Sequence, residues 1–133
     1  MSEHRYGFGV ETTLSPEEAE SKIREALADE GFGILTEIDV ASTLKNKLDI
    51  DVAPYRILGA CNPQLAYQAL TAEHSIGLLL PCNVIVYERE DGSAIEILEP
   101  NLMAELTDNS HLRELAGDAK TRLERALAKL EAG

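Results

Sequence analysis

Aromatic and basic residues are scarce in this chain of 133 residues. It has no tryptophan, four tyrosines and two phenylalanines, and its 12 lysines and arginines stand against 24 aspartates and glutamates. The net charge is −12, and no run of basic residues offsets it. Proteins that bind nucleic acids displace counterions from phosphates with lysine and arginine, so the composition predicts no nucleic-acid partner.

Long apolar stretches are also missing. None approaches the roughly 20 residues that a membrane-spanning helix needs. The first residues, Met1–Arg5, do not lead from a basic region into an apolar core as a signal peptide does. We therefore expect no membrane association and a cytoplasmic location, where the acidity helps to keep the protein in solution.

Cysteine occurs only at Cys61 and Cys82. In a reducing compartment both are expected to be free thiols, and two cysteines are too few for a tetrahedral zinc site. The histidines His4, His74 and His111 stand at no metal-ligand spacing from one another or from a cysteine. The chain also has no phosphate-binding loop and no dinucleotide fingerprint. The sequence thus specifies no metal centre of a known pattern, and any cofactor stays unknown.

The residues that are present describe an ordinary globular domain. Apolar residues make up 44% of the chain and charged residues 27%, which is typical of a folded protein. The length lies in the range of a single domain, roughly 50–250 residues. Because no repeat, low-complexity tract or linker divides the chain, we expect one domain over residues 1–133.

Hydrophobic periodicity predicts the order of the elements. Strands are expected at residues 6–12, 34–40, 55–61, 78–87 and 93–98. Helices are expected from Pro16, where Ser15 and Glu18 form a capping box, over residues 41–48, after Asn62, and after residues 107–109, where the apolar stripe is longest. The order β-α-β-β-β-β-α with short inserted helices favours an α+β fold, in which helices cover one face of an antiparallel sheet of about five strands. Pro81 cannot donate to a ladder and is expected at an edge or a bulge.

Two segments have a more specific pattern. Residues 55–63 read YRILGACNP, and residues 76–84 read IGLLLPCNV. These segments resemble central motifs of the Domain of Unknown Function 302 family, and the resemblance extends from about Tyr6 to the last helix. It implies a sheet with helices on one face, similar to the TATA-binding-protein-like class in fold but not in DNA binding. Where the family often has Asp-Pro after the fifth strand, this chain has Glu99-Pro100. The resemblance implies no activity, substrate or cofactor.

The two Cys-Asn steps, Cys61-Asn62 and Cys82-Asn83, are the sharpest candidate site. If their strands are neighbours, two thiols and two amides converge. Cys61 precedes a helix N-terminus, which can lower a thiol pKa and favour a nucleophile, a redox thiol or a soft-metal ligand. In the simpler alternative, the cysteines only pack in the core and Asn62 only caps the helix.

Other polar residues are weaker candidates. Arg56 and Lys47 are placed to hold an anionic ligand or to balance nearby carboxylates. Glu37 and Asp39 alternate on one strand, where they are available for acid–base chemistry or simply solvated.

The working hypothesis is a small module that binds a small molecule or a soft metal ion near Cys61, Asn62, Cys82, Asn83 and Arg56. The alternatives are a thiol enzyme in which Cys61 attacks and Cys82 resolves, and a non-catalytic interaction domain. A homodimer is expected because closed homodimers are the commonest oligomers.

Overall fold

All strand pairs in the sheet are antiparallel. The computed structural model describes residues 1–131, and its six-stranded sheet has the order β1-β2-β6-β5-β4-β3. The strands are β1 (Ser2–Glu3), β2 (Gly7–Thr12), β3 (Gly33–Asp39), β4 (Tyr55–Cys61), β5 (Cys82–Arg89) and β6 (Gly92–Leu98). The predicted α+β class is confirmed. The sixth strand is the two-residue β1, too short to leave a periodic signal in the sequence.

Helices occupy most of the remaining chain. They are α1 (Pro16–Asp29), α2 (Val40–Leu48), α3 (Pro63–Ala72), the 3₁₀ helix η1 (His74–Leu79), α4 (Asn101–Glu105) and α5 (Ser110–Glu131). Helix α1 begins as predicted, because the Ser15 hydroxyl accepts from the Glu18 amide at 3.2 Å. It ends at Asp29, and Gly31 two residues later has a φ of +86°, which suits glycine. Among residues 1–131, no helix is both long and apolar enough to cross a bilayer.

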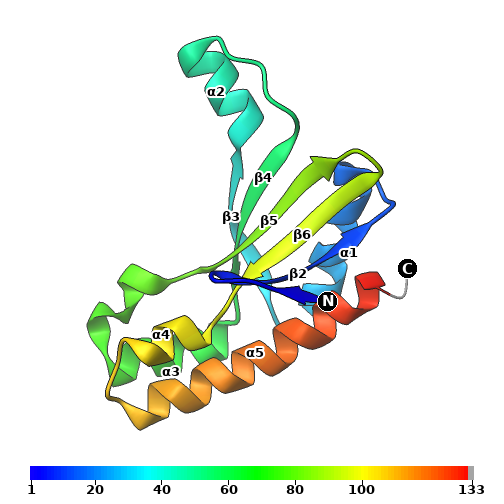
Figure 1. Ribbon diagram of the computed structural model, residues 1–133. Helices are drawn as coiled ribbons and strands as arrows, with labels where there is room; N and C mark the ends of the chain where they lie inside the picture. Colours follow the sequence, from blue (N-terminus) through cyan, green and yellow to red (C-terminus); the bar gives the residue numbers. More distant parts are fainter. Residues whose placement is uncertain (132–133) are drawn as a thin grey trace.

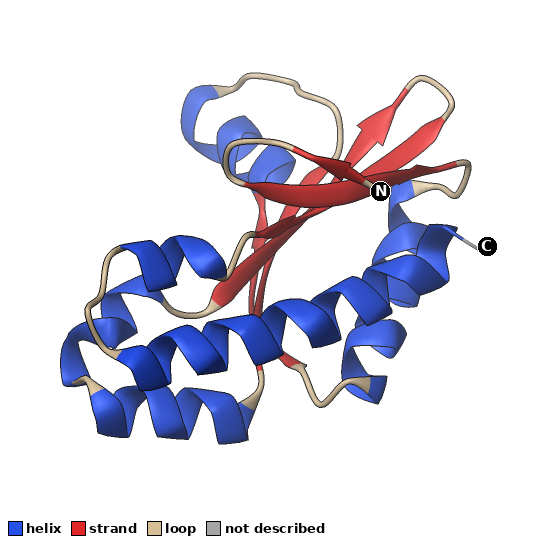
Figure 2. Cartoon of the chain, turned by 60° about the horizontal axis from the view of Figure 1, so that its bottom comes forward, coloured by secondary structure: helices blue, strands red, loops and turns tan. Residues whose placement is uncertain are grey.

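One face of the sheet carries the hydrophobic core. Leu58, Val84 and Ile97 point toward the helices and are fully buried, and their partners in adjacent strands continue the same layer. Helices α1 and α5 contribute Ile23 and Leu123 to this core. Figure 2 shows the long helix running beneath the sheet with the shorter helices beside it, while the opposite face has no such helical layer.

The region around Pro81 differs from the prediction. Residues 78–80 belong to η1 and its end rather than to a strand, and β5 begins only at Cys82. Strand β5 lies between β4 and β6, so Pro81 precedes a central strand instead of marking an edge. Because Pro81 stands before the first residue of β5, its missing N–H leaves the ladder intact. A Cβ on Gly59 would clash with Thr36 Oγ1 and lie 2.7 Å from Pro81 Cγ, so the glycine makes room for both side chains.

Strand β3 and helix α2 form an extension at one edge of the sheet. Helix α2 stands apart from the other helices (Figure 1), and neither element has a buried residue. Strand β3 is held by its pairing with β4, and Asp39 caps α2 by accepting from the Ser42 amide at 2.9 Å. Ile34 at the start of β3 is partly buried against the core, and the rest of this part of the fold depends on backbone pairing and capping.

Candidate functional site

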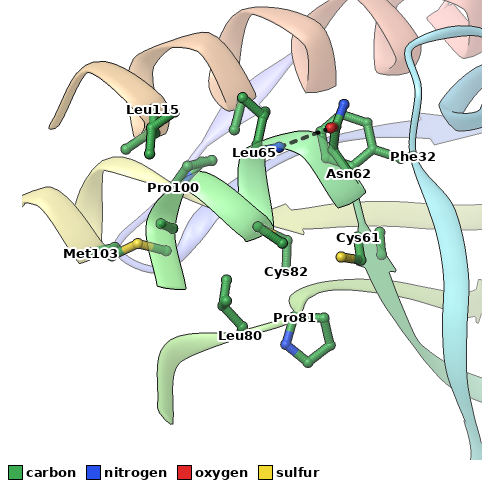
Figure 3. A pocket seen from close by; sticks show the side chains of 15 residues that line it. Phe32, Cys61, Asn62, Leu65, Leu80, Pro81, Cys82, Pro100, Met103 and Leu115 are labelled. Atoms are coloured by element: carbon green, nitrogen blue, oxygen red, sulfur yellow. Dashed lines mark hydrogen bonds between the residues drawn. The ribbon is translucent and has the colours of Figure 1, made fainter. Parts of the chain in front are cut away.

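A pocket opens where the ends of β4 and β5 meet helices α3, α4 and α5. Its cavity volume is about 50 Å³, and it is open to solvent on one side. Figure 3 shows side chains from all these elements turned toward this space. The lining residues are Phe32, Ala60, Cys61, Asn62, Leu65, Ala66, Ala69, Leu80, Pro81, Cys82, Pro100, Met103, Leu115, Ala116 and Ala119.

Small side chains on two helices leave this space open. Helix α3 presents Ala66 and Ala69 to the pocket, and α5 presents Ala116 and Ala119. The pocket lies between the main core and a second apolar cluster formed by Ala69, Ile76, Leu112 and Leu115. A methyl group reaches much less far than a leucine side chain, so the two helices pack together without filling the gap between the clusters.

Both cysteines lie at this pocket, as free thiols. Cys82 is directly opposite Ala60 in the β4–β5 ladder, and Cys61 is the next residue along β4, half-buried at its end. In Figure 3 the Cys61 sulfur points toward the space beside Pro81 and Cys82. The structure thus brings the two Cys-Asn steps to one end of the sheet.

The thiols are not activated as the position of Cys61 suggested. Burial raises the pKa of Cys61 above its usual value. Burial, together with the neighbouring Cys61, raises the pKa of Cys82 to about 11. The free amide of Leu65 at the start of α3 donates to Asn62 Oδ1 at 3.2 Å, so the helix end is satisfied by asparagine rather than by a thiolate. The alternative in which the helix N-terminus lowers the Cys61 pKa is therefore not supported.

The two asparagines have different surroundings. Asn62 is buried and caps α3, and its side chain lines the pocket. Asn83 is exposed and pairs with Gly59 in the ladder. Successive residues of a strand point to opposite faces, so Asn83 lies on the face away from the helices. Only three of the four Cys-Asn side chains meet at the pocket.

Arg56 lies elsewhere. Its guanidinium binds Glu20 of α1 at 3.0 Å and approaches Glu37 and Asp39 of β3 at 3.8 Å. Glu37 also pairs with Arg24. The two carboxylates that were candidates for acid–base chemistry are thus partners of Arg56 in a surface network. Lys47 is exposed on α2, so the structure does not join these residues to the cysteines.

Comparison with known proteins identifies the relatives of the chain. The family model described as Domain of unknown function DUF302 matches residues 8–130. The chain belongs to the DUF302 family. The crystal structure of an uncharacterized conserved protein DUF302 from Bacillus stearothermophilus superposes with a TM-score of 0.87 at 29% identity, covering 96% of this chain and 99% of that one. No curated protein matches the chain. The family expected from the two Cys-Asn motifs is therefore confirmed.

In this DUF302 chain an apolar groove adjoins the pocket. It shares Leu80, Pro81, Cys82, Pro100 and Met103 with the pocket and continues past Asn83 to further leucines. Leu78, Leu79 and Leu106 are exposed, and Leu98 and Leu102 are half-buried. Sequence reasoning missed this groove because residues 78–80 were interpreted as a buried strand. The proline after the leucine run was the available signal that the run ends before the strand begins.

Charged ligands for a metal ion are not gathered in this DUF302 domain. Within residues 1–131, no group of three or more histidine, cysteine, aspartate or glutamate side chains could hold an ion. His4 instead pairs with Glu96 at 2.6 Å, and His111 lies 3.8 Å from Glu114. Any metal site at the pocket would have to be built from the two thiols and the Met103 thioether, which line it together.

Proposed function

We propose that the protein binds a small, uncharged, mostly apolar molecule in the pocket beside Cys61 and Cys82. The observation that carries this proposal is the lining itself. In a chain of net charge −12, no residue around the pocket is charged. Ligand sites are typically concave and mostly apolar, with a few polar groups that orient the ligand.

The polar groups at the pocket support a neutral ligand. The Asn62 oxygen is already engaged by the Leu65 amide, and both thiols have raised pKa values. Near pH 7 each thiol is therefore a neutral, weakly polar group that can contact an apolar molecule without carrying charge. Since a thiolate is the nucleophilic form, the same raised pKa values disfavour the alternative of a thiol enzyme. Free thiols also agree with the proposed cytoplasmic location.

Benzene is a suitable first probe, because it is small, uncharged and apolar, as the lining of the pocket is. We expect a titration followed by ¹⁵N–¹H NMR to shift the amide signals of Ala66, Cys82 and Ala119 in a saturable manner. In Ala116→Leu, the larger side chain fills the pocket from α5, and the shifts should disappear. Ala128 is exposed on the same helix, so Ala128→Leu is the matched control and should keep them.

The opposite pattern would refute the proposal. If benzene shifts none of the pocket amides, or if Ala116→Leu binds it as well as the natural chain does, the pocket is not a ligand site. Ala116→Leu must be folded for either result to count, and dispersed amide signals in its spectrum show that it is.

A soft metal ion is the second candidate, because three sulfur atoms, from Cys61, Cys82 and Met103, line the same pocket. Thiolates and thioethers select copper(I). Binding would have to release both thiol protons against their raised pKa values, so the affinity should increase with pH. Copper(I) titration should give one ion per chain in the natural protein and none in Cys61→Ser/Cys82→Ser. Equal binding by the two proteins would exclude this candidate.

A further inference from the structure

The extension formed by β3 and α2 lacks support from its own chain. We call residues 38–54 the arm. Helix α2 has nine residues and buries none of them, although isolated helices shorter than about 12–15 residues are marginal in water. Four large apolar side chains of the arm are 42–61% exposed: Ile38, Leu48, Ile50 and Val52. Amphipathic elements normally bury their apolar side against a second layer, so the arm is an element whose second layer is missing.

The uncovered face of the sheet continues the apolar surface of the arm. Ile38 of β3 pairs with Ile57 of β4, and Ile57 pairs with Ile85 of β5. The three isoleucines form a row across three strands on the face opposite the core. Beside this row, Tyr55 stacks on Tyr87 with ring centroids 5.6 Å apart. The row meets the arm at Ile38, so the face and the arm form one surface.

The charge distribution indicates what covers this surface. The arm together with Tyr55 and Arg56, residues 38–56, contains two lysines, one arginine and three aspartates, so this part has no net formal charge although the whole chain carries −12. Arg56 pairs with each of the nearby carboxylates, those of Glu20, Glu37 and Asp39. The nearest carboxylate on the uncovered face is Glu96, which is held by His4 and the Tyr87 hydroxyl. A second copy of this acidic chain is repelled by most of the surface but not by this part.

We propose that a second copy of the chain packs its uncovered sheet face and its arm against the uncovered sheet face and the arm of the first copy. Two antiparallel sheets pack face to face about 10 Å apart. A two-fold axis would bring the isoleucine row of one copy against that of the other, because an isologous interface uses the same patch on both subunits. The arm of each copy then rests on its partner, which supplies the layer that α2 lacks. This inference is independent of the proposed pocket ligand.

The mass in solution tests the proposal. Sedimentation equilibrium should give the natural chain twice the 14.5 kDa of one copy. In Ile38→Glu and in Leu48→Glu, a carboxylate is forced into the interface, so the dimer dissociation constant should rise by about 100-fold or more. The control is Tyr67→Glu on α3, because Tyr67 is 73% exposed but lies outside this surface. It should stay dimeric.

Each of the other outcomes overturns the proposal. A natural chain that remains monomeric at about 100 µM, well above a micromolar dissociation constant, means that a different partner or none covers the arm. A dimer that survives both glutamate variants uses another surface. Far-UV circular dichroism checks folding, and if Ile38→Glu unfolds, Leu48→Glu decides because Leu48 is 61% exposed.

Discussion

The two ends of the sheet are built in opposite ways. At the pocket end, α3 and α5 pack against each other and α5 packs against β2, and the core beside them contains fully buried residues such as Leu58 and Leu123. At the arm end, neither β3 nor α2 has a fully buried residue. The pocket end therefore obtains its order from its own core, while the arm depends on strand pairing and on the second copy proposed above. Substitutions at matched positions in the two regions should separate these sources of stability.

The largest difference is expected between core and arm truncations. Leu123→Ala removes a fully buried side chain and should lower the free energy of unfolding by about 2–5 kcal/mol, since a cavity remains. Ile38→Ala removes a side chain that is 48% exposed and should cost less than about 1 kcal/mol in the monomer. Urea denaturation at low protein concentration measures both. A similar cost for the two would contradict the contrast between the regions.

The next effect concerns the pH dependence of the pocket end. Burial raises the pKa of Cys82 to about 11, so the folded state holds its thiol proton more tightly than the unfolded state. The resulting stability is complete below the ordinary thiol pKa of about 8.5 and is lost as the pH rises toward 11, by about 2–3 kcal/mol at most.

Urea denaturation between pH 7.5 and pH 10.5 should therefore show a steeper loss of stability in the natural chain than in Cys82→Ala, which lacks the thiol. Other groups also titrate in this range, but they are common to both proteins. Parallel curves for the two proteins would show that the Cys82 thiol does not hold its proton in the folded state.

A smaller effect distinguishes the two helix caps. Asn62 caps α3 and Asp39 caps α2, each accepting from a backbone amide. Asn62→Ala should cost about 1 kcal/mol of global stability because α3 is packed into the fold. Asp39→Ala should leave global unfolding of the monomer nearly unchanged and instead speed amide hydrogen exchange in α2, since this helix can open locally. Equal global costs would mean that α2 unfolds together with the core.

The smallest effect is expected at the ion pairs between the two regions. Arg56 is 30% exposed and pairs with Glu20, which Arg24 also contacts at 3.0 Å. Arg56→Gln should cost less than about 1 kcal/mol, and the cost should shrink in high salt. Urea denaturation with and without about 1 M sodium chloride, at which the Debye length is about 3 Å, measures this. A larger loss that is insensitive to salt would give Arg56 a structural role beyond these pairs.

Much of the fold could be predicted because it depends on local patterns. The capping box at Ser15 fixes the start of α1, and the apolar stripe of the last helix places α5 over the core. The prediction was wrong at residues 78–80, because a short apolar run has the same composition in a strand as in a 3₁₀ helix that packs against α3. Periodicity alone does not separate these cases.

The candidate site was predictable only in part. The repeated Cys-Asn pattern indicated the region around Cys61, Asn62 and Cys82, all of which line the pocket. It did not indicate that Asn83 lies on the other face or that Arg56 pairs with Glu20. Nor did it show that alanines on two distant helices leave the space open, because no local pattern links residues 66–69 to residues 116–119.

The sequence by itself determined the class of fold, the family and the helix caps at Ser15 and Asn62. These properties follow from the order of residues within a few turns or strands. The tertiary structure alone decided that the thiols share one pocket, that burial raises their pKa values, and that one sheet face and the arm remain uncovered. Burial and desolvation depend on which distant segments pack together, and the spacing of residues along the chain does not contain that information.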